Sequence, residues 1–135
     1  MAGYSGTPLT QKLGIKAGSR VKTAQAPSHY RALLAPLPDD AVVSSKLRPP
    51  VDILHLFSRS RSERQAGLER GLREIRPNGA IWVSWPKKTS RVSTDVTENV
   101  VRELALPLSL VDVKVCAVDD VWSGLKLVIR KDLRR

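Results

Sequence analysis

Two almost wholly apolar segments, separated by a helix-length stretch, constrain the fold of this chain more than any other feature. The first, VDILHLF, covers residues 51–57, and the second, AIWVSW, covers residues 80–85. A strand that is apolar along its whole length is typical of a sheet covered on both faces. Two such strands joined by a helix predict a parallel pair with a right-handed crossover.

The stretch between the two strands predicts the longest helix of the chain. Ser60 and Glu63 stand at capping-box spacing, and the turn PNG at 77–79 marks the expected end. The residues Leu68, Leu72 and Ile75 fall on one apolar stripe. Gly67 and Gly71 weaken the helix, but they leave room for close packing against a sheet.

The remaining elements follow from shorter patterns. We expect an N-terminal arm over 1–18 that holds a short helix capped by Thr7. Strands are expected at 20–26 and 41–47, and helices within 28–37 and 95–106. A hairpin of strands 110–118 and 124–130 and a basic tail at 131–135 complete the chain. In the hairpin, Val111, Val113, Val115 and Ala117 alternate with more polar residues, which predicts one apolar face.

The order of these elements defines an α/β fold class. We expect a reduced Rossmann-like three-layer sandwich, with a mostly parallel sheet of five or six strands closed by a C-terminal antiparallel hairpin. A chain of 135 residues suffices for one hydrophobic core, so residues 1–135 are expected to form a single domain.

Charge and composition restrict the classes of partner. The formal net charge of +10 favours an anionic ligand, nucleic acid or an acidic protein, although solubility alone is the competing explanation. The apolar runs are shorter than a membrane helix, the N-terminus lacks a signal-peptide pattern, and Cys116 is the only cysteine. We therefore expect a cytoplasmic protein without a membrane partner.

The later half of the chain resembles a known fold, and nearly the whole chain resembles one family. The run SERQAGLERGLREIRPNGAIWVSW with the closing hairpin is similar to the later half of the class I methyltransferase fold. The glycine-rich turn of that fold is replaced here by Ala26-Pro27-Ser28-His29-Tyr30, and its second-strand acidic residue has no counterpart. The blocks GYSGTPLTQKLGIKAG, VDILHLF, GAIWVSWPKK, TDVTENVVRELALPL and LVDVKVCAVDDVWSGLKLVIR resemble a family of small bacterial proteins of unknown function. That resemblance implies a Rossmann-like fold and no established activity.

Ligands of an open parallel sheet bind beyond the carboxyl ends of its strands, which selects the candidate site. The candidate ligand-binding residues are Ser28, His29, Arg59, Ser60, Trp85, Lys87, Lys88, Asp119 and Trp122. The cations suit a phosphate or carboxylate, and the two tryptophans are candidates for an aromatic wall.

Each of these residues also has a purely structural explanation. Pro86-Lys87-Lys88 can end a strand with solubilising charge, the tryptophans can be core residues, and Asp119-Asp120 can form a polar hairpin turn. His55 lies within a buried strand, where we expect a hydrogen-bonded structural role. No catalytic motif and no metal-ligand spacing occurs, so no catalytic residue, metal or cofactor is assigned.

These features lead to three hypotheses. The first is a non-catalytic binding or regulatory protein with a basic crevice for an anionic ligand, nucleic acid or an acidic partner. The alternative is a diverged S-adenosylmethionine-dependent methyltransferase, since the strand order is shared. The third is a structural homodimer that pairs through the C-terminal hairpin.

Overall fold

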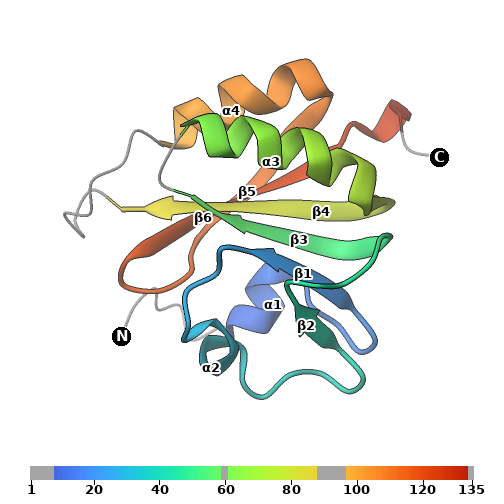
Figure 1. Cartoon of the computed structure of the whole chain (residues 1–135), viewed down its shortest axis with the longest axis vertical. Helices are drawn as coiled ribbons and strands as arrows, with labels where there is room; N and C mark the ends of the chain where they lie inside the picture. Colours follow the sequence, from blue (N-terminus) through green and yellow to red (C-terminus); the bar gives the residue numbers. More distant parts are fainter. Residues whose placement is uncertain (1–7, 59–60, 88–96, 134–135) are drawn as a thin grey trace.

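A computed structural model describes residues 8–58, 61–87 and 97–133, and its centre is a six-stranded mixed sheet (Figure 1). The strand order is β2-β1-β3-β4-β6-β5. The strands are β1 (Arg20–Ala24), β2 (Val42–Ser44), β3 (Val51–Phe57), β4 (Ile75–Pro86), β5 (Leu110–Ala117) and β6 (Trp122–Ile129). β1 pairs in parallel with β2 and β3, β3 pairs in parallel with β4, and β6 pairs antiparallel with both β4 and β5.

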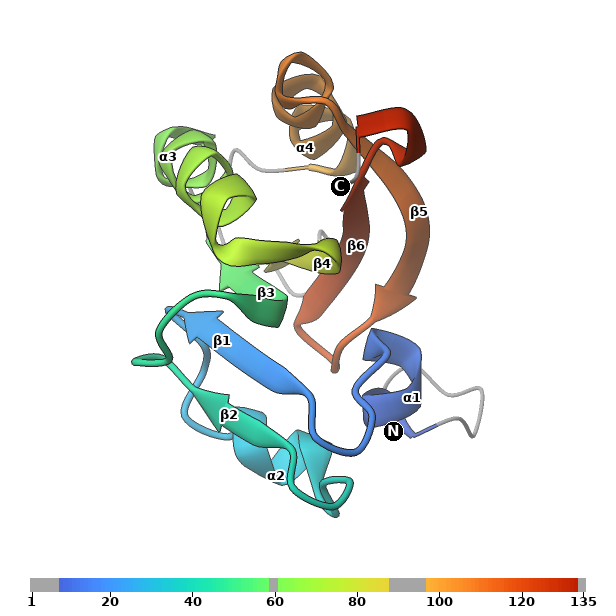
Figure 2. The same cartoon turned by 90° about the vertical axis from the view of Figure 1, so that its right-hand side faces the viewer.

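Helices cover both faces of this sheet, which gives the expected three layers (Figure 2). The helices are α1 (Leu9–Leu13), α2 (Tyr30–Leu34), α3 (Arg61–Glu74) and α4 (Glu98–Ala105), with 3-10 turns η2 (Leu106–Leu108) and η3 (Lys131–Leu133). α3 and α4 lie on one face, and α1 and α2 lie on the other. The predicted Rossmann-like α/β class is confirmed. Within the described part of the chain, no helix is both long and apolar enough to cross a bilayer.

β3 is buried on both faces, as its apolar sequence predicts. Leu54 and Leu56 belong to the hydrophobic cluster under α3 and α4. Ile53 and Phe57 belong to the cluster on the side of α1 and α2. The strand therefore forms the centre of both core layers.

The predicted structural role of His55 is confirmed by a buried chain of hydrogen bonds. The Tyr30 hydroxyl lies 2.7 Å from His55 Nδ1, and the Ser84 hydroxyl lies 2.7 Å from His55 Nε2. The imidazole also stacks on Phe57 with ring centroids 4.2 Å apart. Burial, together with the nearby Cys116, raises the pKa of Tyr30 above its ordinary value. These hydrogen bonds link α2, β3 and β4 through buried polar groups that have their partners within the core.

Two glycines allow α3 to lie close to the sheet. A Cβ atom at Gly71 would stand 2.5 Å from Leu54 Cδ2, and one at Gly67 would stand 3.1 Å from Leu56 Cδ1. Since β3 supplies both leucines, the helix is seated directly on that strand. The packing role expected for these glycines is confirmed.

Several boundaries differ from the sequence expectation: β1 ends at Ala24, β2 covers only Val42–Ser44, and Ile75, expected on the helix, begins β4. The turn expected at 77–79 is a bulge inside β4, because Val51 pairs with Ile75 whereas Ile53 pairs with Ala80. β6 begins at Trp122, which was expected in the hairpin loop, because Trp122 pairs with Pro86. α1 begins at Leu9 with Pro8 at its N-cap, and the predicted cap Thr7 lies outside the described residues.

The predicted hairpin is present, but the apolar face of β5 is exposed at two of its valines. Val113 is 58% exposed and Val115 is 47% exposed, because β5 is an edge strand. The register also shifts between Asp112 and Lys114, which interrupts the alternation at Val113. The homodimer expected through this hairpin stays a prediction.

We predict that Gly71→Ala lowers the free energy of unfolding by about 1–2 kcal/mol, because the overlap of the new methyl group with the buried Leu54 side chain outweighs the gain in helix propensity. Gly67→Ala is the matched control, since its contact is looser and the gain in helix propensity of up to about 1 kcal/mol offsets it. Urea unfolding of both variants measures the difference. Equal stability of Gly71→Ala and the wild type would refute this account of the helix seat.

Candidate functional site

β1 and β3 run parallel, but the strands that follow them are added to the sheet on opposite sides, and this switch in winding locates the candidate site. From β1 the chain passes through α2 to β2 on one side, and from β3 it passes through α3 to β4 on the other. Such a switch point opens a crevice at the carboxyl ends of the two strands. Here those ends are Ala24 and Phe57, followed by Gln25 and Ser58.

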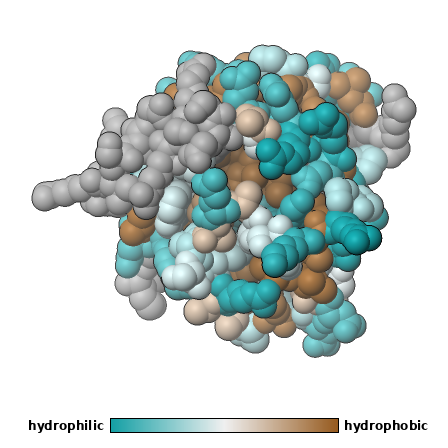
Figure 3. All heavy atoms as spheres, in the orientation of Figure 1, coloured by the Kyte–Doolittle hydropathy of each residue, from teal (hydrophilic) through white to brown (hydrophobic). Residues whose placement is uncertain are grey.

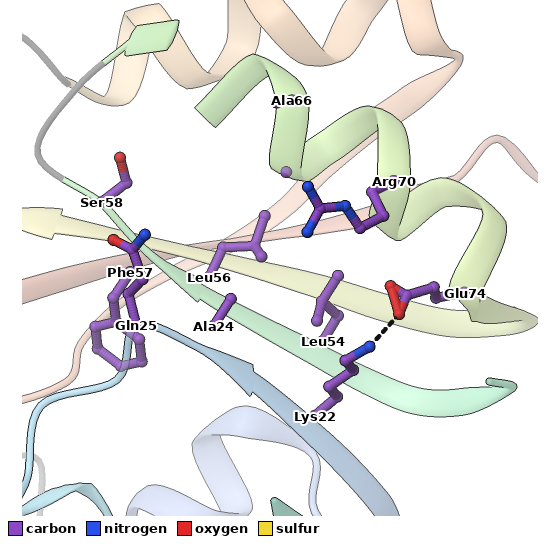
Figure 4. Close-up of a pocket in the computed structure, with 11 residues that line it drawn as sticks. Lys22, Ala24, Gln25, Leu54, Leu56, Phe57, Ser58, Ala66, Arg70 and Glu74 are labelled. Atoms are coloured by element: carbon purple, nitrogen blue, oxygen red, sulfur yellow. Dashed lines mark hydrogen bonds and ion pairs between the residues drawn. The ribbon is translucent and has the colours of Figure 1, made fainter. Parts of the chain in front are cut away.

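A pocket opens at this switch point on the face that carries α3. Its volume is about 290 Å³, and β1, β3 and α3 form its walls (Figure 4). The lining residues are Lys22, Ala24, Gln25, Leu54, Leu56, Phe57, Ser58, Ala66, Gly67, Arg70 and Glu74. The space-filling view of this side shows apolar surface bordered by hydrophilic side chains (Figure 3). We call this cavity the switch-point pocket.

Charged groups of two kinds border the switch-point pocket. Lys22 of β1 forms an ion pair with Glu74 of α3, whose side chain is only 10% exposed. The Arg70 guanidinium points from α3 toward Leu56 (Figure 4). It makes no hydrogen bond or ion pair with the part of the chain that the structure describes. Lys22 is already paired with Glu74. Of the two cations that line this pocket, Arg70 is therefore the one available to a ligand.

The turn after β1 is tight although it contains no glycine. Gln25 has φ of 60°, in the left-handed region that glycine adopts most readily. The chain therefore turns sharply at the lip of the switch-point pocket while still carrying a side chain there. Ala26 and Pro27 continue this turn on the opposite side of β1.

Four of the predicted site residues meet in a separate cluster at the same sheet edge: His29, Lys87, Asp119 and, through its backbone N–H, Trp122. His29 Nε2 lies 2.7 Å from Asp119 Oδ2, and Lys87 Nζ donates to the Asp119 carbonyl oxygen at 2.8 Å. The backbone N–H groups of Val121 and Trp122 each donate to Asp119 Oδ1 at 2.8 Å. The turn between β5 and β6 is thus tied to the loop after β1 and to the end of β4.

The Asp119 carboxylate makes more hydrogen bonds than any other group of this cluster. Burial acts to raise its pKa, but the hydrogen bonds from His29 and from the N–H groups of Trp122 and Val121 outweigh that effect. The pKa of Asp119 consequently lies below its ordinary value. Asp119 holds the hairpin turn, as its structural explanation predicts, and it also contacts His29 and Lys87.

The remaining predicted side chains are distributed differently. Trp85 and Trp122 are 7% and 8% exposed and lie in the two core clusters, so they pack the core and do not form an aromatic wall. Ser28 lines a second cavity on the α2 side of β1. Arg59, Ser60 and Lys88 lie outside the described residues.

Sequence reasoning missed the residues that give the switch-point pocket its chemistry. These are ordinary charged residues of a strand and a helix, namely Lys22, Arg70 and Glu74. They lie close together only when α3 packs on the sheet beside β1. The glycine pair at 67 and 71 was the available signal, because it showed which helix face lies on the sheet. In the described ranges, no three His, Cys, Asp or Glu residues group as metal ligands do.

Comparisons with known proteins place this fold among methyltransferases. A putative type 11 methyltransferase from Sulfolobus solfataricus has a TM-score of 0.65 and 13% identity, covering 97% of this chain and 95% of that one. TrmN from Thermus thermophilus has a TM-score of 0.62 at 13% identity, and the Methanococcus jannaschii fibrillarin pre-rRNA processing protein has 0.63 at 8%. No protein-family profile matches this sequence, and no curated protein sequence does.

These similarities establish the fold of the chain. It has a Rossmann-like fold similar to that of these methyltransferases, with an antiparallel strand pair at its C-terminal end. The match covers 90% of this chain and 47% of TrmN, and 92% of this chain and 69% of the fibrillarin. The chain therefore spans about half of the length of TrmN.

We predict that Asp119→Ala lowers the free energy of unfolding by about 1–2 kcal/mol near pH 7, because it leaves the Val121 and Trp122 N–H groups and His29 without their acceptor. The pKa of Asp119 is depressed in the folded state, so its contribution is present above the unfolded pKa of about 4 and is lost as pH falls through the folded value. Urea unfolding at a series of pH values measures this.

The neighbouring Asp120→Ala is the control, since Asp120 is exposed. We expect it to change stability by less than about 0.5 kcal/mol at every pH. A difference between the wild type and Asp119→Ala that persists unchanged at pH 2 would contradict the carboxylate's role.

Proposed function

We propose that this protein binds a small molecule, carrying an anionic group beside an apolar ring, in the switch-point pocket, and that it acts as a binding or regulatory protein without catalysing a reaction. One observation carries the proposal. The Arg70 guanidinium borders a pocket floored by Leu54 and Leu56, at the point of an α/β sheet where ligands bind.

Arginine suits the anionic end of such a ligand. Its planar guanidinium can donate two parallel hydrogen bonds to a carboxylate or a phosphate. Glu74 lies one helical turn further along α3, but its pairing with Lys22 takes up its charge. The +10 net charge of the chain adds long-range attraction for anions.

The size and lining of the pocket support a small ligand. A volume of about 290 Å³ is just below the range of about 300–1,000 Å³ that is typical of small-molecule sites, which favours a small ligand. Leu54, Leu56 and Ala66 offer an apolar surface to a ring. Nucleic acid and acidic proteins stay predicted partners on charge alone, because no described surface argues for either.

The arrangement of the titratable groups around the pocket supports binding without catalysis. Lys22 and Glu74 are paired with each other, and Arg70 has a guanidinium that donates hydrogen bonds and accepts none. His29 and Asp119 are held together in the separate cluster at the hairpin turn and do not line the pocket. This arrangement supports recognition of a ligand.

A second candidate is an S-adenosylmethionine-dependent methyltransferase. The comparisons favour it, because the similar structures include methyltransferases that match this chain over 90% of its length or more. The left-handed turn at Gln25 favours it as well, since it reproduces a backbone conformation that glycine usually supplies. The side chains at Gln25 and Pro27 oppose it, because they restrict how closely a cofactor can approach the backbone.

Thermal unfolding with two probes separates the candidates. We expect an aromatic carboxylate, indole-3-acetate, to raise the melting temperature of the wild type by several degrees at saturating concentration, because a ligand at about 100 times its dissociation constant stabilises by about 2.7 kcal/mol. Arg70→Gln should abolish this shift. Arg73→Gln, an exposed arginine one turn along α3 that does not line the pocket, should retain it.

The second probe is S-adenosylhomocysteine at about 1 mM, a concentration at which binding tighter than about 0.1 mM gives a clear shift. A shift with this probe alone would replace the binding protein by the methyltransferase candidate. No shift with either probe would contradict ligand binding in the switch-point pocket.

A further inference from the structure

A second cavity lies on the opposite face of β1, between the ends of β1 and β2 and the helix α2. Its volume is about 280 Å³. Successive residues of a strand face opposite sides, so Thr23 faces this cavity while Lys22 and Ala24 face the switch-point pocket. Besides Tyr30, whose hydroxyl lies 2.7 Å from His55 Nδ1, the polar side chains that line it belong to Thr23, Ser28, Arg31, Ser44, Ser45 and Lys46.

Thr23 is the observation that points to a ligand. The residue is 8% exposed, and its side chain makes no hydrogen bond with any residue that the structure describes. Buried hydroxyl groups in folded proteins nearly always have a hydrogen-bond partner. A hydroxyl that is buried at the wall of a cavity, with no partner among the described residues, is suited to bind a group inside that cavity.

The charges around the cavity determine the chemistry of that group. Arg31 donates one hydrogen bond to the Val43 carbonyl oxygen, which leaves other N–H donors of its guanidinium available. The Lys46 ammonium has no partner in the described ranges, although its backbone N–H donates to Ser44 Oγ at 3.1 Å. Of the described residues that line this cavity, none is Asp or Glu. Two cations and several hydroxyl donors match an anion with several acceptor oxygens.

We propose that this cavity is a binding site for a phosphate group. Thr23 donates from the buried wall, Lys46 and Arg31 supply positive charge, and the serine hydroxyls at 28, 44 and 45 supply further donors. A tetrahedral oxyanion accepts hydrogen bonds in several directions, as this arrangement requires. The site uses none of the residues that line the switch-point pocket, so it stands or falls independently of the proposed function.

Titration with inorganic phosphate, followed by ¹H–¹⁵N NMR at constant ionic strength, tests the proposal. We expect saturable shifts of the amide signals of Thr23, Ser28 and Ser44 at phosphate concentrations below about 10 mM. Thr23→Val keeps the shape of the side chain and removes only a hydroxyl that has no described protein partner, so the variant should fold. It should weaken phosphate binding about tenfold, as should Lys46→Ala.

Lys131→Ala is the matched control, because it removes one exposed positive charge from the far C-terminal turn. It should change the affinity less than about twofold. Ribose 5-phosphate serves as a second probe. Tighter binding of this ester than of inorganic phosphate identifies a phosphorylated metabolite as the ligand, and tighter binding of inorganic phosphate identifies the free anion.

Two results would overturn the phosphate site. The first is the absence of saturable shifts at these amides with either probe. The second is an equal loss of affinity in Lys131→Ala and Lys46→Ala, which would show nonspecific attraction to a basic protein.

Discussion

The seat of α3 on β3 is the contact on which the rest of this structure depends. Gly67 and Gly71 bring the helix so close that a methyl group at either position would press on Leu56 or Leu54. A helix seated over β3 and β4 leaves the neighbouring face of β1 beside it, and the switch-point pocket lies in that space. The same seat brings Glu74 to Lys22 and directs Arg70 toward the pocket.

Polar contacts then fix the carboxyl edge of the sheet around that pocket. The Tyr30–His55–Ser84 chain anchors α2 to β3 and β4 inside the core. The contacts of Asp119 join the hairpin turn to the loop after β1. A preformed cavity loses less conformational freedom when a ligand binds, which is why ligand sites are usually built on such rigid edges.

Much of the fold could be predicted from sequence, because buried parallel strands are recognisable as uninterrupted apolar runs. VDILHLF and AIWVSW located β3 and most of β4, and the glycines at 67 and 71 indicated the packed face of α3. The valine alternation indicated the strand β5 but not whether its apolar face is buried, since an edge strand with an exposed face shows the same pattern. The tryptophans were equally ambiguous, because an aromatic residue at a strand end suits both a core and a ligand.

The candidate site was less predictable for a topological reason. Loops after strands could be placed at one edge, and His29, Lys87 and Asp119 do meet there. The switch-point pocket depends instead on which strand faces the crossover helix, and no local pattern marks Lys22 or Arg70 for that position. The pairing of Lys22 with Glu74 spans two elements that are far apart in the chain, so it becomes visible only in the folded structure.

The most direct test of the central claim is methyl NMR of leucine-labelled protein during titration with indole-3-acetate. Binding in the switch-point pocket predicts shifts of the Leu54 and Leu56 methyl signals, because both side chains line it. The methyl signals of Leu13 and Leu34, which lie in the opposite core layer, should stay in place. Shifts confined to Leu13 and Leu34, or no saturable shift at Leu54 and Leu56, would contradict the account.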